Sequence, residues 1–177
     1  SFSNFNSEDI SQILLECEDM FAAARPRSEQ MEVAAQVESK IKNKISEIKS
    51  DENKYQLFAY LSEIYRSTFQ YEASYKAGLN GVKSSATFFN HQSHNSILDS
   101  LLNLERYEDF LEEIEAAKND KFPHFKNFMM NYYLKLEKYD LAMAECEEYY
   151  DQDFEALQYN KAYIMLKAKN FEEAESL

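Results

Sequence analysis

Two histidines placed three residues apart are the first feature of the sequence that could do chemistry. On a helix, His91 and His94 would share one face, as two ligands of a zinc ion do. A zinc site needs at least one more protein ligand, and the nearest acidic residue, Asp99, stands at the wrong spacing to join that face. The pair therefore predicts no metal site.

An acidic run, Asp151-x-Asp153-x-Glu155, has part of the spacing of a calcium-binding loop. It lacks the central glycine of that loop, and Ala162 stands where the bidentate glutamate belongs. Carboxylates are also favoured at the start of a helix, where they complement the helix dipole. We therefore expect this run to open a helix.

The remaining candidate motifs are also incomplete. The segment Gly78-Leu-Asn-Gly81 lacks the Gly-Lys-Ser/Thr ending of a phosphate-binding loop. Cys17 and Cys146 belong to no motif, and neither has a histidine near it in sequence. Without a triad, metal or phosphate motif, we expect no enzyme activity, no cofactor and no metal.

Charge and composition narrow the class of protein. The 177 residues carry a formal net charge of −13, which disfavours nucleic acid as a partner because phosphate binding needs a concentrated basic surface. No apolar run approaches the ~20 residues that cross a bilayer, so we expect no membrane partner. Two cysteines outside any motif are typical of reduced, buried thiols, which favours a cytoplasmic protein.

Helical patterns cover the first fifty residues. Ser7 can cap a helix, and an apolar stripe then follows with steps of three and four to Ala24. Arg25-Pro26 should end that helix, because proline disfavours a helical residue before it. A second helix is predicted from about Ser28 to Lys49, with its inner side at Met31, Ala34, Val37, Ile41, Ile45 and Ile48. Together they predict a helical hairpin.

From residue 51 the chain repeats itself. Residues 104–110, 136–142 and 168–174 align without gaps, and their aromatic anchors Tyr107, Tyr139 and Phe171 stand 32 residues apart. A fourth copy places Tyr71 in the same slot, 36 residues before Tyr107. Each copy predicts two helices joined by a short turn at the anchor. The small residues Ser62, Gly78, Gly81 and Ala162 are expected where two helices approach closely, the glycines alternatively at a helix end.

Residues 54–177 resemble the tetratricopeptide repeat family. The resemblance is carried by Phe58-x-x-Leu61-Ser62-x-x-Tyr65 with Tyr71, by Met129-Met130-x-x-Tyr133 with Tyr139 and Ala142, and by Ala162 with Phe171 and Ala174. The leading Trp of the family and the glycine before each anchor are absent, and Phe110 replaces a small residue.

The resemblance implies an all-α fold, an α-α superhelix formed as a right-handed solenoid of stacked helical hairpins. Residues 1–50 would then be a degenerate repeat or N-terminal cap, and residues 51–177 about three and a half continuous repeats. A first residue that is not Met, and a last segment that stops about two turns into a helix, favour a fragment of a longer protein.

Such an array implies a concave groove along its leading helices, and helical spacing within the aligned copies gives the residues that would face it. They are Tyr60, Glu63, Asn95, Asp99, His124, Asn127, Phe128, Asn131, Tyr159, Asn160 and Tyr163. Asparagine offers a donor and an acceptor to a peptide backbone, and aromatic rings are effective interface anchors. Asn131 and Asn160 resemble the paired asparagines with which tetratricopeptide repeats grip a peptide. The alternative is that these amides face water and the tyrosines pack between helices.

The resulting hypothesis is a protein- or peptide-binding scaffold. Clamps for acidic C-terminal tails carry a lysine where this chain has Asn127, so with Glu63 and Asp99 present a basic or neutral amphipathic segment suits the groove better. Two alternatives remain open, a ligand-responsive regulator that senses peptides and an assembly subunit of a larger complex. Self-association through the open C-terminal repeat is a further partner hypothesis.

Overall fold

The computed structural model describes residues 10–24, 27–84 and 91–176. Across these residues the chain is all-helical, with no strand. Its helices are α1 (Ser11–Ala23), α2 (Arg27–Glu47), α3 (Asp51–Ser67), α4 (Tyr71–Ser84), α5 (His91–Asn103), α6 (Tyr107–Asn119), α7 (Phe125–Lys135), α8 (Tyr139–Tyr149) and α9 (Phe154–Glu175). The all-α prediction is confirmed.

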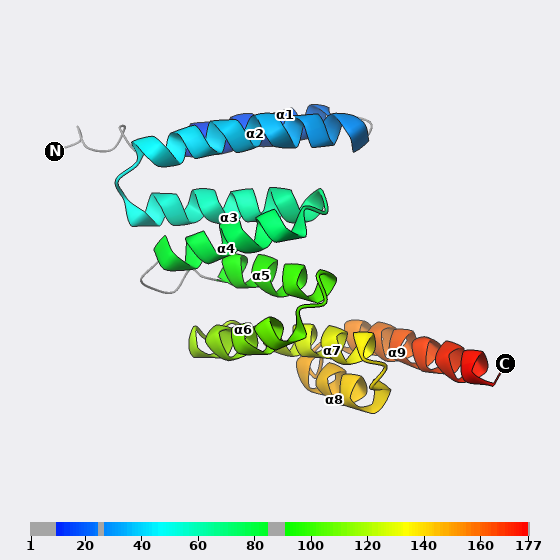
Figure 1. The fold of residues 1–177 in the computed structure, drawn as a ribbon. Helices are drawn as coiled ribbons and strands as arrows, with labels where there is room; N and C mark the ends of the chain where they lie inside the picture. Colours follow the sequence, from blue (N-terminus) through cyan, green and yellow to red (C-terminus); the bar gives the residue numbers. More distant parts are fainter. Residues whose placement is uncertain (1–9, 25–26, 85–90, 177) are drawn as a thin grey trace. The chain divides into compact units, whose positions relative to one another are not determined.

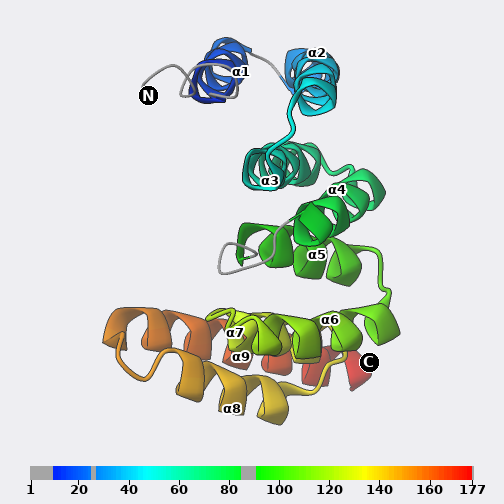
Figure 2. The ribbon, with the colours of Figure 1, turned by 90° about the vertical axis from the view of Figure 1, so that its left-hand side faces the viewer.

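The chain divides into two compact units, Ser1–Ala116 and Ala117–Leu177. The division falls within α6, whereas the sequence suggested a change from cap to repeats at residue 50. In the first unit the helices pack in chain order from α1 to α5, and α3 also contacts α5 (Figures 1 and 2). In the second unit α7 packs on α8 and α8 on α9. Consecutive packing of this kind is consistent with a helical repeat.

The N-terminal hairpin forms as the apolar pattern predicts. The core of this region is built from Ile10, Cys17, Ala34, Val37, Ile41 and Ile48, together with residues of α3 and α4. Met31 is the exception among the predicted inner residues, since it is exposed. Ser7 and Arg25-Pro26, where we expected a cap and a break, lie outside the described residues.

The anchor tyrosines mark three equivalent corners. Tyr71, Tyr107 and Tyr139 are the first residues of α4, α6 and α8, each directly after a turn that ends the preceding helix. Two residues before each anchor the backbone is left-handed, with φ of 61° at Phe69, 57° at Glu105 and 59° at Glu137. The three copies anchored by Tyr71, Tyr107 and Tyr139 therefore share one backbone geometry at the predicted turn.

Each corner is closed by the same pair of backbone hydrogen bonds. At the second corner the N–H of Glu105 donates to Leu102 O at 3.1 Å, and that of Arg106 donates to Leu101 O at 3.0 Å. This is the Schellman arrangement, whose left-handed position favours glycine. The end of α6 uses it too, with φ of 57° at Lys121. A non-glycine residue in that conformation costs about 1–2 kcal/mol, which the rest of the fold must offset.

Small residues lie where neighbouring helices approach most closely. Ser74 of α4 donates its hydroxyl to Ser62 O of α3 at 2.7 Å, and both residues are buried. A Cβ added to Gly78 would lie 2.6 Å from Ile97 Cγ1 of α5. Both glycines, Gly78 and Gly81, lie inside α4, so close approach explains them and a helix end does not.

The prediction of a turn at the last anchor, Phe171, is wrong. α9 runs without a break from Phe154 to Glu175, and Ala162, which was expected at a close approach of two helices, is exposed. A left-handed residue at Lys169 would cost about 1–2 kcal/mol, and the helical conformation there avoids that cost.

Candidate functional site

One predicted groove residue of the C-terminal unit, Asn127, contacts the hydroxyl of a tyrosine, Tyr150. Tyr150, directly after α8, donates its hydroxyl to Asn127 Oδ1 of α7 at 3.1 Å. The side chain of Asn160, from α9, lies close enough to the same hydroxyl to lower the pKa of Tyr150. Tyr150 therefore bonds to an amide of α7 and lies near one of α9. We call Asn127, Asn131, Tyr150 and Asn160 the amide cluster.

Two asparagines of the amide cluster have the same local geometry. Nδ2 of Asn131 donates to the backbone oxygen of Asn127 at 2.8 Å, and Nδ2 of Asn160 donates to that of Ala156 at 2.8 Å. Each bond uses one of two N–H groups and holds the amide in one orientation. Both side chains are half-buried, so their entropy is already partly lost before any partner arrives.

The hydroxyl at the centre of the cluster remains a donor at neutral pH. Burial, first, and the neighbouring Tyr149 and Cys146 raise the pKa of Tyr150 above its usual range, while the nearby side chain of Asn160 lowers it. Burial dominates, because it removes water from the charged phenolate. The cluster is therefore a neutral arrangement of donors and acceptors, which suits a peptide backbone better than a charged group.

Two other predicted residues lie beside the cluster. His124 Nδ1 lies 2.5 Å from the Tyr149 hydroxyl, with the two rings edge to face. Phe128 differs from the sequence expectation, since it is 7% exposed and its ring packs against Phe122 at a centroid distance of 6.0 Å. Because the Phe128 ring is buried in the core, a ligand cannot reach it, and the ring contributes to the packing of α7.

The predicted tyrosines of α9 face solvent. Tyr159 is 73% exposed and Tyr163 42% exposed, one helical turn apart. Lys167 Nζ lies 5.5 Å from the centroid of the Tyr163 ring. Ile164, on another side of the same helix, is buried. Exposed aromatic rings next to a fixed amide cluster supply the apolar contact area that interface anchors provide.

In the N-terminal unit, Tyr60 and Glu63 border a cleft of about 370 Å³ between α1 and α3, with Phe21 and Glu18 also in its lining. Tyr60 is half-buried against the core. Burial, followed by the nearby Cys17 and the carboxylates of Glu18 and Glu63, raises the pKa of Tyr60 far above its usual range. The phenol stays neutral in a cleft whose charged lining is acidic.

Arg66 lies between the two predicted acids of this unit. Its guanidinium nitrogens are 3.7 Å from Glu63 Oε1 and 3.8 Å from Asp99 Oδ2. Gln92 Nε2 also donates to Glu63 Oε2 at 2.6 Å, and Asn95, one turn before Asp99, is half-buried. The sequence left Arg66 out, although its position three residues after Glu63 was a signal for the pairing. Tyr150 was also missing from the predicted groove residues, and its position in the sequence gave no signal for its contact with Asn127.

The predicted residues therefore form two groups, one in each unit. Tyr60, Glu63, Asn95 and Asp99 belong to the first unit, and the residues of the amide cluster with Tyr159 and Tyr163 belong to the second. Tyr150 bonds to Asn127 and lies near Asn160, and Arg66 pairs with both Glu63 and Asp99.

The residues that could do chemistry have structural partners. His94 is buried, and its Nδ1 lies 2.5 Å from Glu113 Oε1. Asp153 Oδ1 accepts from the backbone N–H of Ala156 at 3.0 Å, which confirms that the acidic run opens a helix. Within residues 10–24, 27–84 and 91–176, no three His, Cys, Asp or Glu side chains gather as metal ligands would.

Helices long and apolar enough to cross a membrane do not occur among the described residues. Comparisons of the chain with models of protein families, with curated proteins and with solved structures found no match.

Proposed function

We propose that this chain is a protein- or peptide-binding scaffold of tetratricopeptide-like hairpins wound into a right-handed superhelix. The observation that carries the proposal is the amide cluster, in which Asn131 and Asn160 are oriented by hydrogen bonds within their own helices and Asn127 by Tyr150. Preorganised donors and acceptors lower the entropic cost of holding an extended backbone. The three equivalent corners support the hairpin repeat.

The proposed ligand is a basic or neutral amphipathic segment. Glu63 and Asp99 outnumber Arg66 in the N-terminal group, and the amide cluster itself carries no charge. The exposed rings of Tyr159 and Tyr163 would contact the apolar side chains of that segment. Two buried, unpaired cysteines support a cytoplasmic location, where thiols stay reduced.

The proposal is tested with a peptide array probed by the folded chain. Asn131→Ala with Asn160→Ala should weaken binding of the array hits at least about fivefold, because each amide can supply about 0.5–1.5 kcal/mol of net hydrogen bonding. The matched control is Asn43→Ala with Asn80→Ala, which removes two exposed helical amides elsewhere. An array without hits, or equal binding by both double variants, would reject the amide cluster as the site.

An assembly subunit is the second candidate, because α9 exposes several large apolar side chains. Besides Tyr159, Met165 is 58% exposed and Leu166 57% exposed. Apolar side chains gathered on one helix often mark a contact between proteins. Light scattering tests self-association, and a chain that stays monomeric at high concentration would exclude assembly of the chain with itself through α9.

A further inference from the structure

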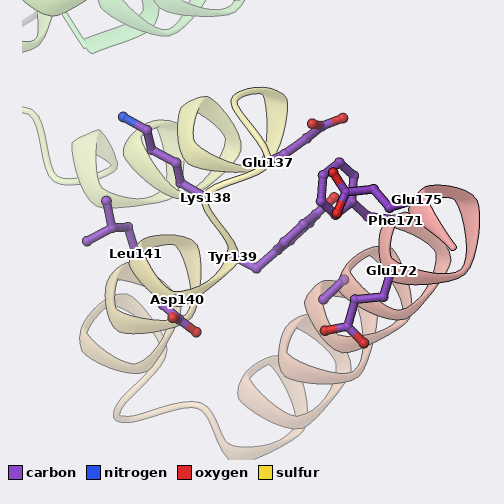
Figure 3. A pocket seen from close by; sticks show the side chains of 9 residues that line it. Glu137, Lys138, Tyr139, Asp140, Leu141, Phe171, Glu172 and Glu175 are labelled. Carbon is purple, nitrogen blue, oxygen red and sulfur yellow. The ribbon is translucent and has the colours of Figure 1, made fainter.

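A second cleft lies within the C-terminal unit, between the first turn of α8 and the last turns of α9 (Figure 3). Its volume is about 580 Å³. None of its lining residues belongs to the amide cluster, so whatever binds here is separate from the peptide site proposed above.

Two aromatic rings line this cleft. Tyr139 of α8 and Phe171 of α9 have ring centroids 5.8 Å apart, with planes inclined at 53°. Figure 3 shows the Tyr139 side chain reaching across the cleft toward Phe171. The faces of such rings carry negative electrostatic potential, so they attract cations within about 6 Å.

Carboxylates surround the aromatic pair. Glu137, Asp140, Glu172 and Glu175 also line the cleft, and all four are exposed. None of the four carboxylates forms a salt bridge within the described part of the chain. Figure 3 shows Glu172 and Glu175 on the same side as Phe171, whereas Lys138, the lysine of the lining, extends away from it. The end of the cleft at the rings therefore has an excess of negative charge.

We propose that this cleft binds an arginine side chain presented by a partner protein. The guanidinium stacks on the rings of Tyr139 and Phe171, and the carboxylates of Glu172 and Glu175 accept hydrogen bonds from its edge. Arginine fits better than lysine, because its planar group stacks on aromatic faces and pairs with carboxylates in a fixed geometry.

The first experiment uses acetyl-arginine-amide and acetyl-citrulline-amide, which have the same shape and differ in charge. We expect the arginine probe to shift the NMR signals of the Tyr139 and Phe171 rings, with a dissociation constant on the order of 1 mM. The citrulline probe should leave them unchanged. Equal shifts from both probes, or none from the arginine probe, would overturn the proposal.

The second experiment separates a local site from the general attraction of an acidic chain. Glu172→Gln with Glu175→Gln should weaken arginine binding about fivefold, the effect of losing two exposed ion pairs. Glu32→Gln with Glu52→Gln makes the same charge change at exposed positions of the first unit, and it should cost less than twofold. Equal losses in the two double variants would show diffuse attraction and would overturn the site.

Phe171→Leu tests the aromatic contribution, since it keeps apolar volume and removes the ring. We expect a loss of about threefold, with unchanged far-ultraviolet circular dichroism. Unchanged binding would contradict stacking of the guanidinium. The Asn131→Ala/Asn160→Ala variant should bind the arginine probe normally, so failure of the amide cluster and failure of this cleft give different results.

Discussion

Replacing the left-handed residue at the end of α6 with glycine should stabilise the C-terminal unit. Lys121 has φ of 57° and closes a Schellman turn through Lys118 O. Lys169 holds an ordinary helical position inside α9, where the repeat pattern had predicted a turn. The same change, Lys→Gly, should therefore have opposite signs at the two positions.

The magnitudes follow from the two backbone conformations. At Lys121 glycine relieves about 1–2 kcal/mol of left-handed strain and adds about 0.5–1 kcal/mol of unfolded-state entropy, so the net gain is about 0.5–1 kcal/mol. At Lys169 no strain is relieved, and glycine in a helix costs about 1 kcal/mol relative to alanine. Both lysines are exposed, so lost side-chain contacts contribute little.

Urea unfolding, followed by circular dichroism, measures both changes. Lys121→Gly should raise the urea midpoint with an unchanged m-value and raise Tm by about 1–4 °C. Lys169→Gly should lower the urea midpoint and Tm. Destabilisation by Lys121→Gly would refute the left-handed turn. Stabilisation by Lys169→Gly would refute the continuous α9 and would favour a fourth corner.

Three further changes test packing, hydrogen bonding and burial, each by urea unfolding. Gly78→Ala should destabilise the first unit by about 1–3 kcal/mol, because the added Cβ meets Ile97, while Asn80→Ala on the exposed side of α4 should not; equal effects would contradict the close approach. Tyr150→Phe should cost about 0.5–1.5 kcal/mol through the lost hydrogen bond to Asn127, and a neutral effect would contradict that bond. Burial raises the pKa of Glu145 in the folded state, so ionisation of this carboxyl opposes folding. Glu145→Gln should therefore stabilise the folded chain at pH 7 and lose that advantage as the pH falls through the raised pKa toward 4.5. A stabilisation that does not depend on pH would contradict this assignment.

Much of the hairpin architecture could be predicted from sequence, because the anchors mark helix starts. Tyr71, Tyr107 and Tyr139 stand where a helix must begin after a turn, and periodic apolar positions identify the faces that pack. Phe171 has the same local pattern without the corner. The local pattern around an anchor is therefore not sufficient to set a left-handed turn.

The candidate site could be predicted only in part. Helical spacing placed Asn127 and Asn131 on one face of α7, and the alignment of the copies placed Asn160 on the corresponding face of α9. The roles of Tyr150 and Phe128 depend on contacts that no spacing encodes. Tyr150 follows α8 in the turn before α9, and Phe128 is buried because Phe122, from the non-helical segment before α7, packs on it.

The side-chain amide signals of asparagine, observed by NMR in chain labelled with ¹⁵N-asparagine, test the central claim most directly. On addition of the tightest peptide from the array, the NH₂ signals of Asn131 and Asn160 should shift at saturation, while those of the exposed Asn43 and Asn80 stay in place. Binding of the peptide with Asn131 and Asn160 unshifted would contradict the claim that the amide cluster holds the peptide backbone.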